Sequence, residues 1–411
     1  MCKDTASITV VYTKNFFVMK KIMNICAAAF GAALLFASCE KDNNSDNNNQ
    51  NKPDESTELE IPETMFFGYY LGDCNEAGTD NVIINLAKGE ISYDDDDNYI
   101  GNGEVCSLDI NIEALAEQYD KDHATLPCGT YTVDTEGTCA AGTINAEDSY
   151  VLKVVDDVVL LDEIAVKSGT VTISEVSSKS AAPAAKISTR KISVDLVLSD
   201  DTPYSFEYEG YAALSNSSEE SLFTNLVADV TVGDLCVASM ANMGNLDDTG
   251  KTETWVISLG DKYYDIETDY GYGESMFLYL NLEPGLEALP SGHFDKFVDL
   301  LDENLTELKP NTLVCGVTFL GLYAGCWYTC PARTLESSMV GGSLDIESSD
   351  ENSDGIFEYK ISGSLEDAYG VKVNFSYTGE IEKMVYDTEE YSLKSASSNK
   401  LYGRKSPVRM K

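Results

Sequence analysis

Histidine is nearly absent from this sequence, and the common catalytic signatures are absent altogether. Only His123 and His293 occur among the 411 residues. The chain contains no G-x-S-x-G elbow, no H-E-x-x-H zinc motif and no Walker-type phosphate loop. We therefore expect the protein not to be an enzyme. A glycosidase that works with two carboxylates is the exception, because 70 acidic residues leave that class open.

Basic residues are also scarce. The chain has 28 Lys and Arg against 70 Asp and Glu, which gives a formal net charge of −42. A protein that binds nucleic acid must neutralise phosphates with Lys and Arg, so this balance excludes nucleic acid as a partner. It also disfavours adsorption of the folded body to an anionic lipid surface.

An apolar run of secretory-signal length lies near the N-terminus. Met19 begins a basic segment, and residues 25–37 form an uncharged, mostly apolar run that ends just before Ser38 and Cys39. The run is short for a spanning helix, which needs about 20 apolar residues, and it has the length of a signal peptide. An uncleaved membrane anchor is the alternative interpretation.

The residues around Cys39 resemble the lipobox of bacterial lipoproteins, in which a cysteine after a small residue is acylated and becomes the mature N-terminus. The segment reads FASC, with Phe36 in place of the usual Leu. Two or three acyl chains anchor a protein stably, whereas one chain binds marginally. The acidic run after Cys39 is similar to the export signal of Bacteroidetes surface lipoproteins. We therefore expect a lipid anchor at Cys39 in the outer membrane, facing outward, with a periplasmic face as the alternative.

Composition divides the chain into six segments. They are an upstream extension from a misplaced start codon (1–18), a lipoprotein signal peptide (19–38), a disordered Asn- and Asp-rich tether (39–60), a first β domain (61–216), a second β domain (217–388) and a basic tail (389–411). After Glu390 the tail has six Lys or Arg and no acid. It could therefore fold back on the acidic body or extend freely.

The two expected β domains are copies of one unit. The segment GEVCSLDINIE at 103–113 aligns without gaps on GESMFLYLNLE at 273–283. Four further pairs keep the same order at an offset near 170 residues: VIINL and WVISL, LPCGTYTV and LPSGHFDKFV, SGTVTI and GGSLDI, FEYEG and FSYTG. This constant order indicates a tandem duplication. A single interlocked β domain is the alternative.

Both units are predicted to consist of β-strands. CSLDINI, GTYTV, GTVTISEV and KISVDLVL alternate apolar and polar residues with a period of two and are rich in Val, Ile and Thr. Turn sequences such as AKGE and DDTG separate such segments. Helical periodicity occurs only in NIEALAEQYDK at 111–121. We expect an all-β fold of two tandem antiparallel β-sandwich or flattened β-barrel domains.

These segments resemble a family of uncharacterised Bacteroidetes surface lipoproteins. The family is built from two copies of a β unit that carries LPxGTYTV, GTVTV and YxG segments. The resemblance covers most of the chain and implies its fold and its location. It implies no activity, because no biochemical role is established for the family.

Eight cysteines remain in the two units once Cys2, Cys26 and Cys39 are set aside. They divide four and four, an arrangement that favours disulfides within each unit outside the cytoplasm. Cys128 and Cys139 flank a predicted strand and turn and are the expected pair. Closing so short a loop would contribute about 3 kcal/mol to stability. Buried free thiols are the alternative.

One loop has oxygen ligands at a spacing that suits calcium. DENSDG places Asp350, Asn352 and Asp354 at alternate positions before a glycine, as in the first half of an EF-hand loop. The twelfth position is Ile361 in place of the Glu that completes such a loop. A polar hairpin tip without an ion is the alternative, and we expect no other cofactor.

Aromatic residues form the last candidate site. Tyrosines gather in 261–279, and the chain has only two tryptophans. Aromatic faces beside acidic groups stack on sugar rings and dominate protein interfaces, although in β proteins they often fill cores. The candidate residues for binding a glycan or a partner are Trp255, Tyr263, Tyr264, Tyr270, Tyr272 and Trp327.

The protein is therefore predicted to be a lipid-anchored surface protein that acts as a non-catalytic binding or adhesion module. A glycan-capture protein of a polysaccharide-utilisation system and a fimbria-like assembly subunit are the two alternatives. Its expected partners are the membrane, reached through the lipid on Cys39, and a protein or glycan ligand that the sequence does not identify.

Overall fold

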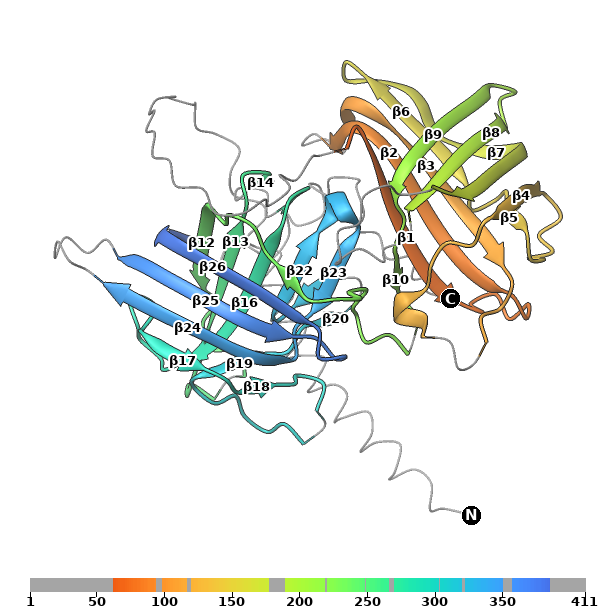
Figure 1. Cartoon of the computed structure of the whole chain (residues 1–411). Helices are drawn as coiled ribbons and strands as arrows, with labels where there is room; N and C mark the ends of the chain where they lie inside the picture. The colour runs from red at the N-terminus through yellow and green to blue at the C-terminus, as the bar shows by residue number, and fades with distance from the viewer. Residues whose placement is uncertain are drawn as a thin grey trace, which may run out of the picture.

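The computed structural model is all-β, as the sequence predicts (Figure 1). It describes residues 62–93, 98–116, 120–176, 189–218, 220–247, 249–265, 270–302, 304–319, 322–349 and 357–384. Within these ranges the only helical elements are two 3-10 turns, η1 (Lys121–His123) and η2 (Pro331–Arg333). The helical periodicity at 111–121 does not produce an α-helix in the described residues, because 111–112 end β3, 113–116 are irregular and 121–123 form the 3-10 turn η1.

No helix in the described part of the chain is both long enough and apolar enough to cross a membrane.

Residues 64–216, called unit 1, contain the first group of strands. These are β1 (Thr64–Gly72), β2 (Asp80–Tyr93), β3 (Tyr99–Ile112), β4 (Gly129–Asp134), β5 (Thr143–Asn145), β6 (Tyr150–Val155), β7 (Val158–Glu175), β8 (Thr189–Leu198), β9 (Pro203–Tyr211) and β10 (Leu214–Asn216). A linker, residues 217–229, joins them to the second group.

Residues 230–384, called unit 2, contain the second group. These are β11 (Val230–Thr231), β12 (Val237–Asn242), β13 (Glu253–Gly260), β14 (Tyr264–Asp265), β15 (Tyr270–Gly271), β16 (Ser275–Leu282), β17 (Gly292–Phe294), β18 (Phe297–Val298), β19 (Thr312–Val314), β20 (Val317–Phe319), β21 (Leu322–Ala324), β22 (Trp327–Cys330), β23 (Leu335–Ser338), β24 (Gly341–Ser349), β25 (Glu358–Glu366), β26 (Lys372–Glu380) and β27 (Glu382–Met384).

The strands of unit 1 form one continuous sheet. Their order is β10-β1-β2-β3-β5-β4-β7-β8-β9, and β6 pairs with both β3 and β7. The long strand β7 pairs with β6 through its first half and with β4 and β8 through its second half. β1 also contacts β9, so the sheet curls into a flattened barrel around its core.

Unit 2 repeats this pairing scheme. β12, β13 and β16 pair in the order of β1, β2 and β3, and β24, β25 and β26 pair in the order of β7, β8 and β9. Gly129 faces Ile173 in unit 1, and Gly292 faces Ile346 in unit 2. The last strand, β27, pairs in parallel with β12, as β10 does with β1. The segments that repeat in the sequence therefore lie on corresponding strands.

The two units differ where one strand changes sheets. β7 is continuous in unit 1, whereas the corresponding stretch of unit 2 is divided into β23 and β24. Unit 2 therefore consists of an 8-stranded sheet and a 5-stranded sheet, with two short hairpins. Figure 1 shows β24, β25 and β26 lying across β12, β13 and β16, as the two layers of a sandwich do.

A glycine with a positive φ lies at the corresponding position of β7 and β24. Gly169 has a φ of 125° and Gly342 has a φ of 98°. A Cβ on Gly169 would lie 2.2 Å from the carbonyl oxygen of Asp195, and a Cβ on Gly342 would lie 2.2 Å from that of Ser364. The backbone conformation and the close approach of the next strand both require glycine.

The YxG segments also have a steric origin. The ring of Tyr208 folds over Gly210, where a Cβ would lie 2.6 Å from the tyrosine hydroxyl. That hydroxyl donates a hydrogen bond to the carbonyl of Tyr211 and fixes the turn at the end of β9. Tyr377 and Gly379 repeat the arrangement at the end of β26. The Tyr-x-Gly spacing therefore arises because the tyrosine ring packs over a residue that has no side chain.

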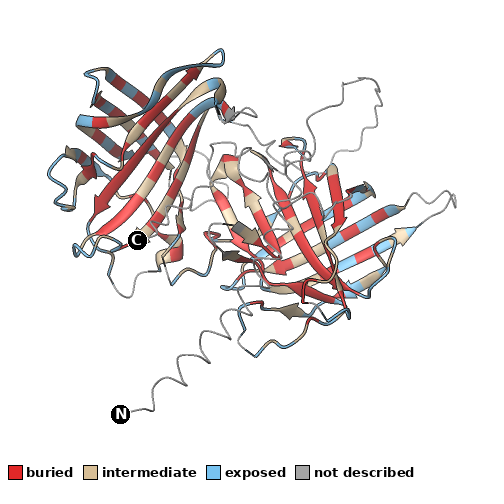
Figure 2. Ribbon diagram, turned by 180° about the vertical axis from the view of Figure 1, so that it is seen from behind, coloured by how far each residue is buried: buried red, intermediate tan, exposed pale blue. Residues whose placement is uncertain are grey.

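Each unit has its own apolar core, visible as the alternating stripes of Figure 2. In β8 every second residue is buried, with Ile192, Val194, Leu196 and Leu198 pointing inward. Burying one such side chain contributes about 1.5–3 kcal/mol. The period-two pattern read from the sequence is therefore the pattern that fills the core.

The requirement for glycine at positions 169 and 342 can be tested by substitution. Gly169→Ala and Gly342→Ala are each expected to lower the free energy of unfolding by more than about 1 kcal/mol, because Cβ would clash with the next strand in a strained conformation. Gly137→Ala is the matched control, since Gly137 has a φ of 67° but no atom within 4 Å of the position that a Cβ would occupy. Equal denaturation midpoints for all three variants would contradict this account.

Candidate functional site

A cleft lies between the two units, with aromatic side chains on both walls. Unit 1 contributes Phe67 and Tyr69 from β1, and unit 2 contributes Tyr264, Phe277 and Tyr323. The other lining residues are Phe66, Gly68, Ala213, Ser215, Gly271, Ser275, Thr329, Pro331, Thr334, Leu335 and Glu336. The free space between the walls is about 90 Å³.

The alternation of β1 supplies the wall of unit 1. Phe66 and Tyr70 are buried in the core of unit 1, while Phe67 and Tyr69 are half-buried on the opposite face. Successive side chains of a strand point to opposite faces, so both sides of β1 carry aromatic residues. The inner pair holds the strand to its core, with Phe66 also bordering the cleft, and the outer pair lines the cleft.

The wall of unit 2 is held by ring contacts. Tyr323 packs edge-on against Trp327, with ring centroids 4.3 Å apart at 81°. Its hydroxyl donates a hydrogen bond to the Glu336 carboxylate at 2.7 Å. Tyr264 meets Phe277 edge-on at 6.1 Å and 69°. Edge-to-face pairs prefer this geometry, so these rings are fixed in place rather than free to collapse into the cleft.

Two of the candidate aromatic residues are corrected by the structure. Trp255 and Trp327 are fully buried, in β13 and β22, so neither can present a face to a ligand. Trp327 does not line the cleft, but its ring packs against the cleft-lining ring of Tyr323. Burying a large apolar ring stabilises the fold strongly, which explains why both tryptophans lie in the core and not at the surface.

The candidate tyrosines have different positions. Tyr264 lines the cleft, and Tyr272 packs against an apolar cluster of unit 1. Tyr263 is half-buried beside the cleft-lining Tyr264, with the Lys262 ammonium 4.9 Å from its ring centroid. The backbone of Tyr270 pairs with Asp265, and its side chain lies outside the described part of the chain.

The expected Cys128–Cys139 disulfide is wrong, since all eight cysteines of the described ranges are free. β4 separates the two residues, and its six residues span roughly 20 Å at the usual rise per residue. The Cys139 thiol lies beside Asn145, at the far end of β4. A disulfide needs Cα atoms within about 7 Å, so the pair cannot close.

Two further predictions fall outside the described residues. They are acylation of Cys39 and the calcium site at Asp350, Asn352 and Asp354. Within the described ranges, no group of three or more His, Cys, Asp or Glu side chains is placed to hold a metal ion.

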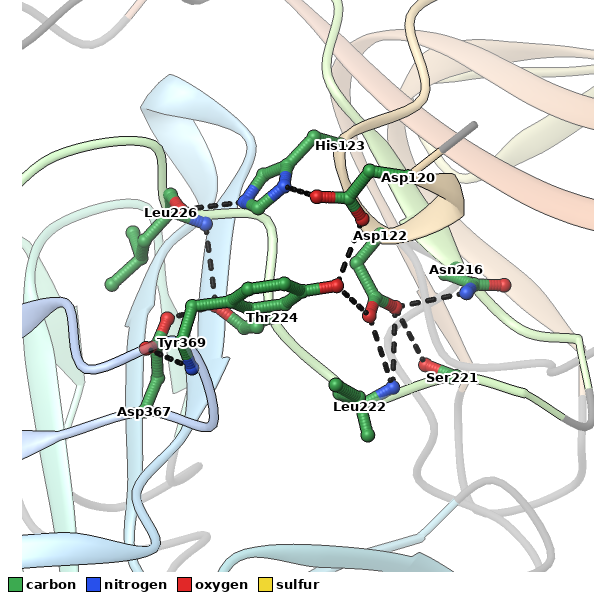
Figure 3. A network of polar contacts seen from close by, with 10 residues as sticks. All are labelled: Asp120, Asp122, His123, Asn216, Ser221, Leu222, Thr224, Leu226, Asp367 and Tyr369. Carbon is green, nitrogen blue, oxygen red and sulfur yellow. Dashed lines mark hydrogen bonds and ion pairs between the residues drawn. The ribbon is translucent and has the colours of Figure 1, made fainter. Parts of the chain in front are cut away.

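A polar junction beside the cleft fixes the two units relative to each other (Figure 3). Asp122, in η1 of unit 1, is 3% exposed. Its carboxyl group accepts hydrogen bonds from the Asn216 side chain at 2.8 Å, the Leu222 amide at 3.2 Å and the Tyr369 hydroxyl at 3.0 Å. A buried carboxyl group is tolerated only with such partners, and here they come from unit 1, the linker and unit 2.

His123 forms the second part of the junction. Its Nδ1 lies 2.6 Å from Asp120 Oδ2, and its Nε2 lies 2.7 Å from the carbonyl oxygen of Leu226. Both partners are acceptors, so both contacts are hydrogen bonds only when the ring is protonated. The ring also packs on Tyr369, with centroids 5.0 Å apart.

The electrostatics of the junction agree with this geometry. Burial alone would lower the pKa of His123, but the hydrogen bonds to Asp120 and to the Leu226 carbonyl outweigh burial and raise it above its ordinary value. Burial alone would raise the pKa of Asp120, and the hydrogen bonds from His123 and Tyr369 outweigh burial and lower it. A charged Asp120–His123 pair is therefore favoured near neutral pH.

Comparison of the chain with models of protein families, with curated proteins and with solved structures gave no match. The interpretation of the cleft therefore rests on its geometry.

Sequence reasoning missed most of the cleft. Phe67, Tyr69, Tyr323 and Glu336 were not singled out, although β1 carries aromatic residues on both faces. A strand with apolar side chains on both faces is buried on both sides, and this signal was present in TMFFGYYLG. Nothing in the sequence shows that β1 meets β21 and β23, because strand pairing alone does not fix how two units dock.

The junction should make stability depend on pH. The raised pKa of His123 means that its contribution is complete below about pH 6.5 and is lost as the pH rises through the raised value. We expect His123→Gln to lower the free energy of unfolding by about 1 kcal/mol at about pH 5.5 and by much less at about pH 8.5.

Chemical denaturation of both forms at the two pH values measures this difference. The control is His293→Gln, which removes an exposed histidine paired with Asp345 away from the junction and should cost little at either pH. A cost for His123→Gln that stays constant with pH would contradict the prediction.

Proposed function

We propose that the protein is a lipid-anchored, non-catalytic binding module that captures its ligand in the cleft between the two units. The observation that carries this proposal is the convergence of Phe67 and Tyr69 from unit 1 with Tyr264, Phe277 and Tyr323 from unit 2 on one space. Aromatic side chains placed in a concave site, with a few polar groups, are typical of ligand sites.

The chemistry of the cleft supports a sugar ring as the captured group. Aromatic faces match the C–H faces of a sugar, and Glu336, Thr329 and Ser275 supply acceptors and donors for hydroxyl groups. The Ser275 and Thr329 hydroxyls are 2.7 Å apart, so they already form a polar pair at the wall. A glycan is therefore favoured over a flat protein surface, which would need no hollow.

The size of the cleft limits what enters it. An engineered apolar cavity of about 150 Å³ binds one benzene ring. The space here is about 90 Å³ and opens to solvent, so it suits one ring that enters in part. We infer that a terminal sugar of a longer glycan occupies the cleft while the rest lies outside it.

The carboxylate content supports capture over hydrolysis. Glu336 is the only carboxylate among the described residues that line the cleft. Hydrolysis of a glycosidic bond generally needs two carboxyl groups on either side of that bond, roughly 5–10 Å apart. The proposed activity is therefore binding without turnover.

The proposed location follows from the leader. Acylation of Cys39 would hold the two units outside the outer membrane, with residues 40–60 as a tether. A captured glycan would then be retained at the cell surface.

Glycan capture can be tested with a glycan array followed by calorimetry on the best ligand. Tyr323→Ala and Phe67→Ala are each expected to weaken binding at least about tenfold, which is about 1.4 kcal/mol, because each removes one aromatic wall. Tyr263→Ala is the matched control, since it changes an aromatic residue next to Tyr264 that does not line the cleft.

Two results would contradict glycan capture. One is the same weak retention on every glycan of the array. The other is an affinity that falls equally in Tyr263→Ala and Tyr323→Ala, since the cleft would then have no special part in binding.

The lipid anchor has a separate test. Cys39→Ser should abolish acylation and release the protein from membranes, because the anchoring acyl chains are attached through this sulfur atom. Membrane fractionation with metabolic labelling by a fatty acid measures both effects. A variant that stays membrane-bound would show that the lipobox interpretation is wrong.

A further inference from the structure

The wall of unit 2 carries one carboxylate in a cleft that is otherwise uncharged. Glu336 lies in β23 and is half-buried, and its Oε2 accepts a hydrogen bond from the Tyr323 hydroxyl at 2.7 Å. The residues that line the cleft in the described part of the chain include no Lys, Arg or His. No cationic side chain among these lining residues therefore neutralises the carboxylate.

The linker holds Glu336 in place through Asn225. The Glu336 amide donates a hydrogen bond to Asn225 Oδ1 at 3.0 Å, and the Asn225 amide donates to the Glu336 carbonyl at 3.1 Å. The Asn225 side chain also donates to the carbonyl of Thr334, a second residue of the wall, at 2.8 Å. Asn225 is 4% exposed, so water competes little for these hydrogen bonds. The backbone and the carboxylate of Glu336 are thus both held, as in a pre-organised binding site.

Aromatic side chains surround the space that Glu336 borders. Phe67 and Tyr69 come from unit 1, and Tyr264, Phe277 and Tyr323 come from unit 2. The face of an aromatic ring carries partial negative charge, so it attracts a cation within about 6 Å of the ring centre, and sites for ammonium ligands use several such rings. Aromatic rings and one carboxylate, without a basic residue, are the composition that suits an organic ammonium group.

Two basic residues lie close to the wall in sequence, and neither lines the cleft. The Arg333 guanidinium lies 3.8 Å from the Glu274 carboxylate, and the Lys262 ammonium lies 4.9 Å from the ring centroid of Tyr263. An acidic sugar would therefore enter the cleft without a cationic partner there, which is costly for a charge that leaves water. The net charge of −42 acts in the same direction, since it attracts cations and repels anions.

We propose that the sugar captured in the cleft carries a free amino group, with its ammonium beside Glu336 and among the aromatic rings. This inference rests on the proposed capture of a glycan and names the class of sugar. The carboxylate would accept charge-assisted hydrogen bonds from the ammonium, and the rings would add cation–π attraction. An N-acetylated amino sugar lacks this charge and a uronic acid carries the opposite one, so both would bind more weakly.

Calorimetry on the full-length protein, below the pKa of the sugar amine, tests this preference. The probes are methyl glycosides of glucosamine and galactosamine, of their N-acetylated forms, of glucose and galactose, and of the corresponding uronic acids. Single sugars are used because a polycation would bind a chain of net charge −42 at many places. We expect a free-amino glycoside to bind at least about tenfold more tightly than the neutral glycosides of the same ring, and the uronic acids to bind most weakly.

The variant Glu336→Gln shows whether this carboxylate carries the preference. Glutamine keeps the length of the side chain and an acceptor for the Tyr323 hydroxyl, but it removes the charge. The ratio of affinities between the free-amino and the N-acetylated glycoside should fall at least about tenfold. The matched control is Glu347→Gln in β24, which removes the same charge from a side chain that is 77% exposed and outside the cleft. It should leave the ratio at the value of the parent protein.

Two outcomes would overturn the proposal. One is a neutral or acidic glycoside that binds the parent protein as tightly as the free-amino glycoside. The other is an equal fall of the ratio in Glu336→Gln and Glu347→Gln, since the preference would then come from the overall charge. If neutral glycosides bind, lose affinity in Phe67→Ala and are not outcompeted by the amine, glycan capture holds and only this inference fails. If no glycan of the array and no glycoside binds, both fail together.

Discussion

The arrangement of this molecule depends on the pairing of the linker with the edge of β23. Backbone groups at a sheet edge must find partners, and the Ser338 amide and the Glu336 carbonyl find theirs in Phe223 and Asn225. This pairing holds the linker against unit 2 just after it leaves unit 1. The aromatic face of β1 is thereby brought opposite Tyr323, and the cleft follows from that placement.

The junction next to this pairing is polar, and that sets its properties. Asp122 is buried because donors from both units and the linker surround it, and His123 bridges Asp120 to the linker. An apolar interface would be insensitive to pH, whereas this one rests on hydrogen bonds whose number depends on protonation. The hydrogen bonds that join η1 to the linker therefore depend on the protonation of His123.

The proposed binding site is a consequence of the duplication. The cleft exists because two copies of one unit meet through faces that differ, with β1 on one side and β21 to β23 on the other. The contact between the linker and β23 is one such difference, because it has no counterpart along β7 in the described part of unit 1.

The sequence by itself determined the strands and the order of the repeated segments, because these depend on local periodicity: every second residue of β8 is buried, as its alternating pattern predicts. Predictions that depend on long-range packing were wrong. The two tryptophans are buried in the core instead of facing a ligand, and β4 separates Cys128 from Cys139, so they form no disulfide. Only the tertiary structure decided the cleft, since Phe67 and Tyr323 on its two walls lie 256 positions apart in the chain (323 − 67). Their meeting depends on how two finished sheets dock, and no local pattern encodes that.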